Sequence, residues 1–69
     1  MTEVALLSQL KTLRTQAGLT QADLAERVGV TRKTINTVEN GVFIPSTVLA
    51  LKLARALSTT VEGIFQLPD

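Results

Sequence analysis

Cysteine, histidine, tryptophan and tyrosine are absent from this 69-residue chain, and Phe43 and Phe65 are its only aromatic residues. Without cysteine or histidine the chain has no disulfide framework and no conventional zinc site, so we expect no metal and no cofactor. General acid–base catalysis would depend on carboxylates or lysines, and the only close acidic pair is Asp23 and Glu26. These two residues are three apart on a predicted helix, where a solvated surface is the simpler interpretation. We therefore expect a binding protein, not an enzyme, with no catalytic residues.

Long hydrophobic runs are missing as well. The apolar run over residues 4–7 is too short for a signal peptide or a membrane span, so we expect a cytoplasmic protein that makes no membrane contact. The length predicts one domain, residues 1–69, with no second domain that could hold a small-molecule effector. Hydrophobic residues make up 45% of the chain, and the lack of aromatics indicates an aliphatic core built from helices.

The net charge is only +1, but the charges are unevenly distributed. Residues 11–37 carry five cations and two acidic residues, a local balance of +3, whereas each flank has a balance of −1. Because the salt dependence of DNA binding follows the number of phosphates neutralised, this modest basic region predicts modest non-specific affinity for DNA.

A tight turn at Gly29 joins two short helices within residues 21–38. Thr20 and Thr31 are suited to cap the two helices, because each hydroxyl can accept a backbone N–H. Gly29 can adopt the left-handed conformation that ends the first helix, and Gly41 ends the second. This bihelical unit is typical of proteins that place the second helix in the major groove of DNA. The positions expected to bury its inner side are Leu24, Ala25, Val28, Val30, Ile35 and Val38.

The outer side of the second helix carries two cations and three neutral hydrogen-bonding side chains, with no carboxylate among them. Arginine and lysine can donate to guanine O6 and N7, and asparagine can pair with adenine. An ordinary helical hairpin without a partner is the alternative, but a merely solvated face normally mixes both charge signs. The pattern therefore favours contact with double-stranded DNA through Arg32, Lys33, Asn36, Thr37 and Asn40.

From about Leu10 to Phe65 the sequence resembles the Cro and phage-repressor type of helix-turn-helix domain, the Xre family. The resemblance implies a compact, all-α, five-helix repressor-like domain that binds operator DNA, usually as a symmetric dimer, and represses or activates nearby genes. We expect a repressor that binds a palindromic operator as a homodimer. The matching strings are Leu13-Arg14, the residues from Gly18 to Ala25, the residues from Val28 to Thr31, Ile35-Asn36, the residues from Glu39 to Gly41, Pro45-Ser46 and Ile64-Phe65.

The resemblance also assigns roles to single residues. It places base reading on Arg32, Lys33, Asn36 and Thr37, and phosphate positioning on Gln21, Thr31, Thr34 and the backbone N–H groups near Asn40. It further implies a structural salt bridge between Arg14 and Glu39. Glu39 lies at the border of the core face, where an unpaired carboxylate would be costly. Two separate solvated charges are the alternative.

Two departures from the family pattern have consequences. Relatives commonly carry a basic or polar residue after the Asn-Gly pair, where this chain has Val42 and Ile44, so a phosphate contact is missing there or is made by the backbone. Gly63 stands where a helix-favouring residue is usual, which costs the short fifth helix about 1 kcal/mol relative to alanine.

The remaining segments are predicted to form the scaffold. A first helix is expected over residues 2–18, a fourth over 47–57 with Ser46 as its cap, and a fifth over 61–66 with Thr60 as its cap. The apolar stripe of the first helix is expected to lie in the core, and it consists of Leu6, Leu10, Leu13 and Ala17.

The fourth helix is apolar beyond one face. Its core stripe is expected to comprise Ala50, Leu53, Ala54 and Leu57, which leaves further apolar residues without a place in the core. We expect these to form a homodimer interface, with scattered surface aliphatics as the alternative. The interface residues expected are Val48, Leu49, Leu51 and Leu67. A second functional hypothesis is an antitoxin-like module, which would bind a different protein partner through its C-terminal helices.

Overall fold

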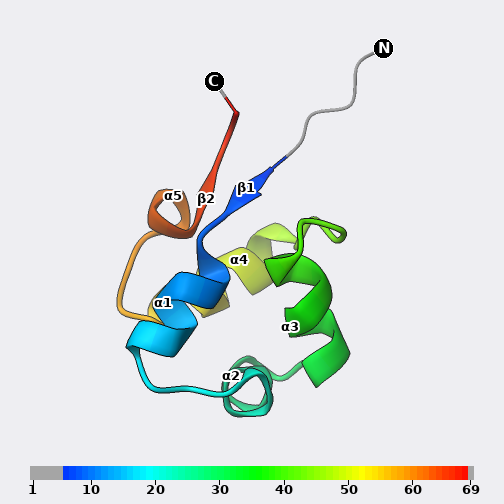
Figure 1. Cartoon of the computed structure of the whole chain (residues 1–69), viewed down its shortest axis with the longest axis vertical. Coiled ribbons are helices and arrows are strands. Elements are labelled where there is room, and N and C mark those ends of the chain that lie inside the picture. Colours follow the sequence, from blue (N-terminus) through cyan, green and yellow to red (C-terminus); the bar gives the residue numbers. More distant parts are fainter. Residues whose placement is uncertain (1–5, 69) are drawn as a thin grey trace.

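The computed structural model describes residues 6–68, which form five short helices and two two-residue strands (Figure 1). The expected five-helix architecture is confirmed, with the small sheet as its only addition within these residues. In chain order the elements are β1 (Leu7–Ser8), α1 (Leu10–Gln16), α2 (Gln21–Val28), α3 (Arg32–Glu39), α4 (Thr47–Ala56), α5 (Val61–Ile64) and β2 (Phe65–Gln66).

Local hydrogen bonds define the ends of α2 and α3 as the sequence predicts. The Thr20 hydroxyl accepts the Asp23 N–H at 3.0 Å, and the Asp23 carboxylate accepts the Thr20 N–H at 3.0 Å, which completes a capping box. The Thr20 N–H bonded to the carboxylate, together with the Thr20 side chain, holds the pKa of Asp23 below its usual range. Gly29 ends α2 in the left-handed conformation with φ 74°, and the Thr31 hydroxyl caps α3 by accepting the Thr34 N–H.

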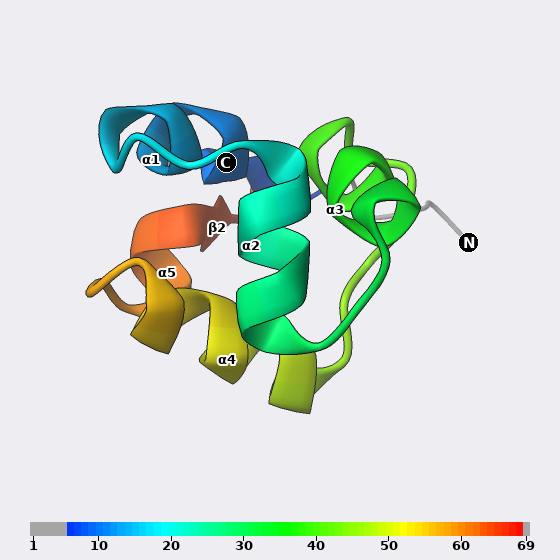
Figure 2. The ribbon, with the colours of Figure 1, turned by 90° about the horizontal axis from the view of Figure 1, so that it is seen from below.

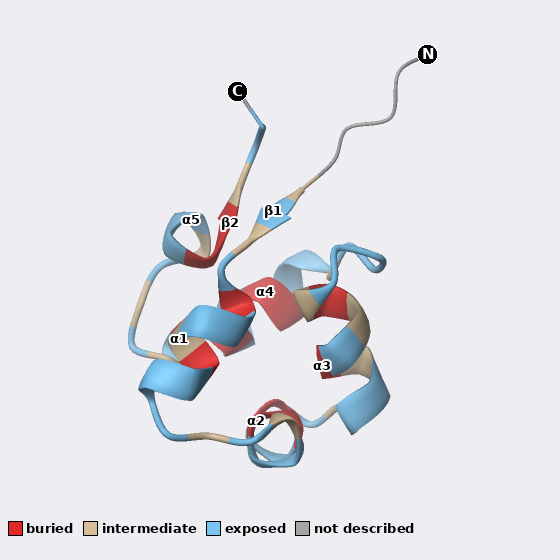
Figure 3. Ribbon diagram, in the orientation of Figure 1, coloured by how far each residue is buried: buried red, intermediate tan, exposed pale blue. Residues whose placement is uncertain are grey.

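Each helix contributes buried aliphatic residues to one core, and the buried positions are coloured red in Figure 3. Helix α2 packs against both α3 and α4, and it lies between them when the molecule is viewed from below (Figure 2). The small side chain of Ala25, which is 4% exposed, is among the buried residues of α2. The largest fully buried side chains are Leu10, Leu24, Ile35, Val38, Leu53 and Ile64.

The start of α1 differs from the expectation. The helix begins at Leu10, not near residue 2, because Leu7–Ser8 is extended and pairs antiparallel with Phe65–Gln66. The Gln9 N–H also donates to the Ile64 carbonyl at 2.7 Å, which continues this pairing to the first turn of the helix. The part of the predicted helix over residues 2–5 lies outside the described residues.

The same pairing shortens the fifth helix. Helix α5 ends at Ile64, and the two residues that were expected to extend it form β2. Two other expectations are wrong for reasons of helix geometry. Ala17 is exposed because it is the C-cap of α1, and Leu49 is buried because it lies one turn before Leu53 on the core face of α4. None of the helices within residues 6–68 has the length and apolar character that crossing a membrane requires.

Candidate nucleic-acid interface

Helix α3 lies at the edge of the molecule, with one side against the core and the other open to solvent (Figure 2). Ile35 and Val38 bury the inner side. Of the residues predicted to read bases, Arg32, Lys33 and Asn36 are exposed and Thr37 is half-buried. The fold therefore presents all four side chains along one short helix.

Arg32 is held by one contact and keeps its outer nitrogens available. Its Nε donates to Gln21 Oε1 at 3.4 Å, and within residues 6–68 no acceptor contacts Nη1 or Nη2. These terminal nitrogens form the fork of donors that matches O6 and N7 of guanine. Beside them lies a shallow hollow of about 400 Å³, which is lined by Gln21, Arg32, Lys33 and Asn36.

The remaining polar groups of the α3 face are organised by bonds along the helix. The Asn40 side-chain amide donates to Asn36 Oδ1 at 3.2 Å, which leaves the Asn36 amide nitrogen available as a donor. The Thr37 hydroxyl donates to the Thr34 carbonyl at 2.9 Å, so its proton is used inside the helix. Thr37 can thus offer a lone pair or its methyl group to a base edge.

The residues predicted to hold phosphates fall into two sets. Thr31 and Thr34 lie together at the start of α3 with their hydroxyl oxygens 3.1 Å apart, and Thr31 is exposed. Gln21 is only partly exposed, and its amide is occupied by two protein contacts. The residues predicted to hold phosphates therefore lie beside the α3 face, but the Gln21 amide is already hydrogen-bonded to Glu39 and Arg32.

The geometry does not support the expectation that backbone N–H groups near Asn40 hold a phosphate. Gly41 adopts φ 73° and turns the chain back over the end of α3. As a result, the four N–H groups from Asn40 to Phe43 donate to carbonyls of Asn36, Thr37 and Val38 at 3.0–3.2 Å. At this position only the exposed side chain of Asn40 remains a candidate for DNA contact.

Arg14 and Glu39 form the expected ion pair between α1 and α3. The Arg14 Nε donates to Glu39 Oε2, and Nη2 lies 3.3 Å from Oε1. The Glu39 side chain is only 3% exposed, and Gln21 Nε2 also donates to its Oε1 at 3.0 Å. The link between Gln21 and Glu39 was not predicted, because the 18 residues that separate them carry no local signal of contact.

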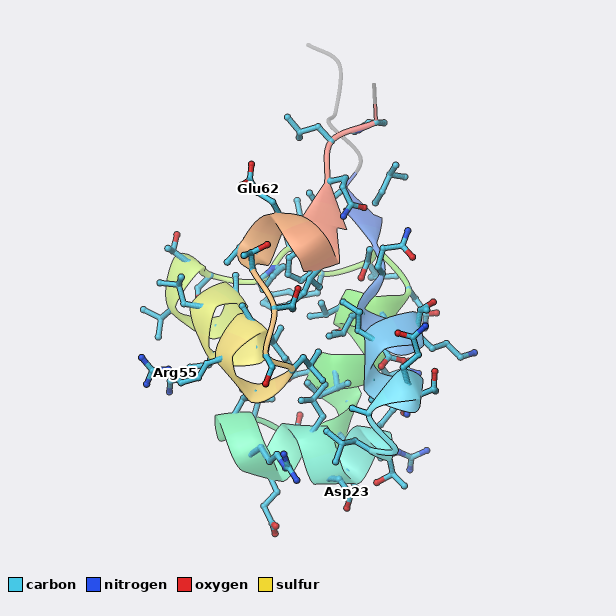
Figure 4. The ribbon with its side chains drawn as sticks, turned by 90° about the vertical axis from the view of Figure 1, so that its left-hand side faces the viewer. Asp23, Arg55 and Glu62 are labelled. Atoms are coloured by element: carbon cyan, nitrogen blue, oxygen red, sulfur yellow. The ribbon has the colours of Figure 1, made fainter. Side chains whose placement is uncertain are left out.

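Burial of Glu39 decides the charge of the α3 face. It is the only acidic residue of α3, and its carboxylate is turned inward to Arg14. The exposed carboxylates of residues 6–68 lie on other elements, at Asp23 and Glu26 of α2 and Glu62 of α5. Figure 4 shows Asp23 and Glu62 pointing outward from these helices. The outer side of α3 therefore carries cations and neutral polar groups alone.

A second surface is apolar. Val48 and Leu51 of α4 are 62% and 57% exposed, and Leu67 is 72% exposed. Leu51 also borders a hollow of about 210 Å³, whose lining includes Val61 and Phe65. Three of the four residues predicted for a subunit interface are thus exposed, whereas Leu49 belongs to the core.

Comparison with known proteins agrees with this geometry. A family model described as "Helix-turn-helix" matches residues 10–64. The chain is 53% identical over 57 residues to an HTH-type transcriptional regulator of Methanothermobacter thermautotrophicus. The aligned residues cover 81% of this chain and 83% of the relative.

Solved structures show the same fold. The restriction-modification controller protein C.AhdI from Aeromonas hydrophila aligns with a TM-score of 0.72 and 42% identity, covering 77% of this chain and 80% of that chain. The master regulator for biofilm formation SinR, solved in complex with DNA, aligns with a TM-score of 0.72 and 25% identity, covering 78% of this chain and 87% of that chain.

Proposed function

Because the chain belongs to the helix-turn-helix family of DNA-binding transcriptional regulators, we propose that it reads a palindromic operator by inserting α3 into the major groove. The observation that supports this proposal is the composition of the α3 face. It has two cations and three neutral polar side chains, whereas the carboxylate of Glu39 is buried against Arg14. An exposed Glu39 would repel phosphates, and its pairing with Arg14 removes that repulsion.

Base reading is proposed for Arg32, Lys33, Asn36 and Thr37. Support comes from their exposure on one helix and from the free terminal nitrogens of Arg32. The start of α3 strengthens the site, because the Thr31 cap leaves a helix N-terminus beside Arg32 and Lys33, where phosphates are attracted. Phosphate positioning is proposed for Gln21, Thr31, Thr34 and the side chain of Asn40. A protein that occupies the groove excludes other proteins from it, so repression is the proposed sign of regulation.

We further propose that the protein binds as a homodimer through the apolar surface of Val48, Leu51 and Leu67. These side chains lie outside the core, and a second copy would cover them. In an isologous contact the two α3 helices would be about 34 Å apart, one turn of DNA, so that they meet successive major grooves. A different protein seated on this surface is the competing occupant, and it would be detected as a second component in the mass of the purified complex.

Selection of bound sequences from random DNA duplexes tests the proposal. The expected product is a palindrome with half-site centres about 10 base pairs apart. Arg32→Ala should cost about 1–3 kcal/mol of binding free energy and relax preference at one or two base pairs of each half-site. Arg55→Ala is the matched control, since Arg55 is an exposed cation that points outward from α4 (Figure 4). Equal affinity for selected and random duplexes would refute sequence-specific binding.

A further inference from the structure

We propose that a cationic hollow, formed where α2 and α4 end, binds an acidic and partly apolar peptide segment of another protein. The inference concerns a surface separate from the α3 face and does not depend on the proposed reading of DNA. The hollow has a volume of about 620 Å³, and it is lined by Glu26, Arg27, Val28, Gly29, Lys52, Arg55 and Ala56.

The cationic hollow opens on a different side of the molecule from the α3 face. Helix α2 lies between α3 and α4 (Figure 2), and the lining comes from the end of α2, the turn after it and the second half of α4, with no residue of α3. Gln21 begins α2 beside the α3 face, whereas Arg27 lies about 9 Å further along that helix. A duplex held by α3 therefore leaves the cationic hollow accessible.

Three cations surround the cationic hollow without carboxylate partners. Arg27, Lys52 and Arg55 are exposed, and within residues 6–68 none of them forms an ion pair. Arg55 extends outward from α4 (Figure 4). Glu26 is the only carboxylate of the lining, so three cations and one anion leave an excess of two positive charges. A partner that supplies carboxylates would compensate this excess.

The helix ends account for part of this charge. Helices α2 and α4 both end at the cationic hollow, and a cation in the last turn of a helix is favoured by the helix dipole. Arg27 and Arg55 occupy such positions. Lys52 lies before the last turn of α4, so the dipole does not explain why a third cation faces the same hollow.

The floor of the cationic hollow distinguishes between classes of anionic partner. Val28, Gly29 and Ala56 bring no polar side chain to it, and the methylene stems of the surrounding cations add apolar surface. The phosphates of a duplex would gain hydrogen bonds from the cations and nothing from this floor. An acidic peptide can place an apolar side chain on the floor while its carboxylates reach the cations. The charge and the floor together therefore favour a peptide.

Titration with a fluorescent peptide tests the proposal. The probe repeats pairs of glutamates separated by single leucines, and its two controls replace either every glutamate by glutamine or every leucine by serine. The probe should bind, and each control should bind about 10-fold more weakly because it lacks either the charges or the apolar anchor. In nuclear magnetic resonance spectra, the amide signals of Gly29 and Ala56 should be among those that shift most.

Substitution of the cations locates the bound probe. Lys52→Gln and Arg55→Gln should each weaken binding about 2- to 5-fold, and the double variant should weaken it about 10-fold. Lys11→Gln is the matched control, because it removes an exposed cation from α1 and should change binding by less than about 2-fold. Helical content and the unfolding midpoint establish that each variant is folded.

Operator DNA separates the cationic hollow from the α3 face. A protein saturated with its selected operator should bind the probe within about 3-fold of the affinity of the free protein, since the two sites lie on different sides. Displacement of the probe by the operator would place the probe on the α3 face and overturn the proposal. A protein that selects no operator would overturn the proposed function, while the peptide titration would still decide the role of the cationic hollow.

The remaining outcomes identify other occupants. Sedimentation of the double variant Lys52→Gln/Arg55→Gln should give the mass of the wild-type protein, and a lower mass would assign the cationic hollow to a second copy of this chain. A second duplex that binds the operator complex and is lost in the double variant would assign it to DNA. No binding of the probe at millimolar concentration would show that the cations serve only the helix ends. Each of these three results would overturn the proposal.

Discussion

Arg14 and Glu39 are 25 residues apart in the chain, and the ion pair between them is almost fully removed from water. Arg14 also donates Nη1 to the Leu19 carbonyl at 2.8 Å, so its guanidinium has partners on two sides. Within residues 6–68, every buried side-chain nitrogen or oxygen has a hydrogen-bond partner. Each charge therefore depends on the other, because either one alone would be a buried ion without compensation.

Removing one member of this pair should destabilise the protein strongly. We expect Arg14→Met and Glu39→Met each to cost about 3–5 kcal/mol of unfolding free energy, because each leaves the opposite charge buried and unpaired. The double variant should recover a large part of that loss, since a pair of apolar side chains needs no compensation. Urea unfolding of the four proteins measures this coupling.

The exposed pair of Asp23 and Arg27 on α2 provides the comparison. These residues are four apart on one helix, and Arg27 contributes to the lowered pKa of Asp23. Because both side chains are solvated, Arg27→Met should change stability far less than Arg14→Met or Glu39→Met does. Additive losses in the Arg14 and Glu39 variants would show that the buried contact contributes no coupling.

At the scale of single elements, α5 shows why a glycine occupies an unfavourable position in a helix. Glycine costs a helix interior about 1 kcal/mol relative to alanine. A Cβ at position 63, however, would lie 2.5 Å from Thr59 Oγ1 and 3.3 Å from Thr60 Oγ1. The Thr60 hydroxyl caps this helix by accepting the Gly63 N–H, so the tight turn leaves no room for a side chain.

We therefore expect Gly63→Ala to destabilise the protein despite the better helix propensity of alanine. The clash should outweigh the propensity gain and give a net loss of about 1 kcal/mol, measured by urea unfolding. Thr59→Ala removes the nearest oxygen. In that background Gly63→Ala should become neutral or stabilising, and an unchanged loss would mean that Thr59 is not the obstacle.

At the scale of the whole molecule, the two surfaces of interest lie on different elements. The polar face belongs to α3, whereas Val48, Leu51 and Leu67 of the proposed interface lie on α4 and just after β2. A dimer formed through the second surface leaves the first free for DNA. Two linked reading helices bind more tightly than one, because the second half-site is engaged at high effective concentration.

Leu51→Glu should convert the proposed dimer into monomers. In an isologous interface the substitution acts twice and brings two like charges together, which costs several kcal/mol of association free energy. Sedimentation measures the mass of the variant, which should be that of a monomer. The affinity for the operator should fall steeply when the dimer is lost. Gln16→Glu adds the same charge at an exposed site on α1 and should leave both unchanged. A dimer mass that persists in folded Leu51→Glu would place the interface elsewhere, with α1 as the next surface to test.

The central part of the fold could be predicted because its causes are local. Thr20, Thr31 and Ser46 cap helices through bonds to residues three positions away, and Gly29 ends α2 through its own φ angle. The outer side of α3 follows from helical periodicity alone. Sequence therefore determined the central helices and their polar and apolar sides, because each depends on residues within one or two turns.

Tertiary structure decided what depends on residues far apart in the chain. Leu7 and Ser8 are extended because they pair with a segment near the opposite end, although the spacing of Leu6, Leu10 and Leu13 alone favours a helix through this segment. Likewise, only the fold brings Gln21 between Glu39 and Arg32. The physical reason is the same in each case. The free energy of these contacts comes from burial and pairing between distant segments, and no local pattern records which segments will meet.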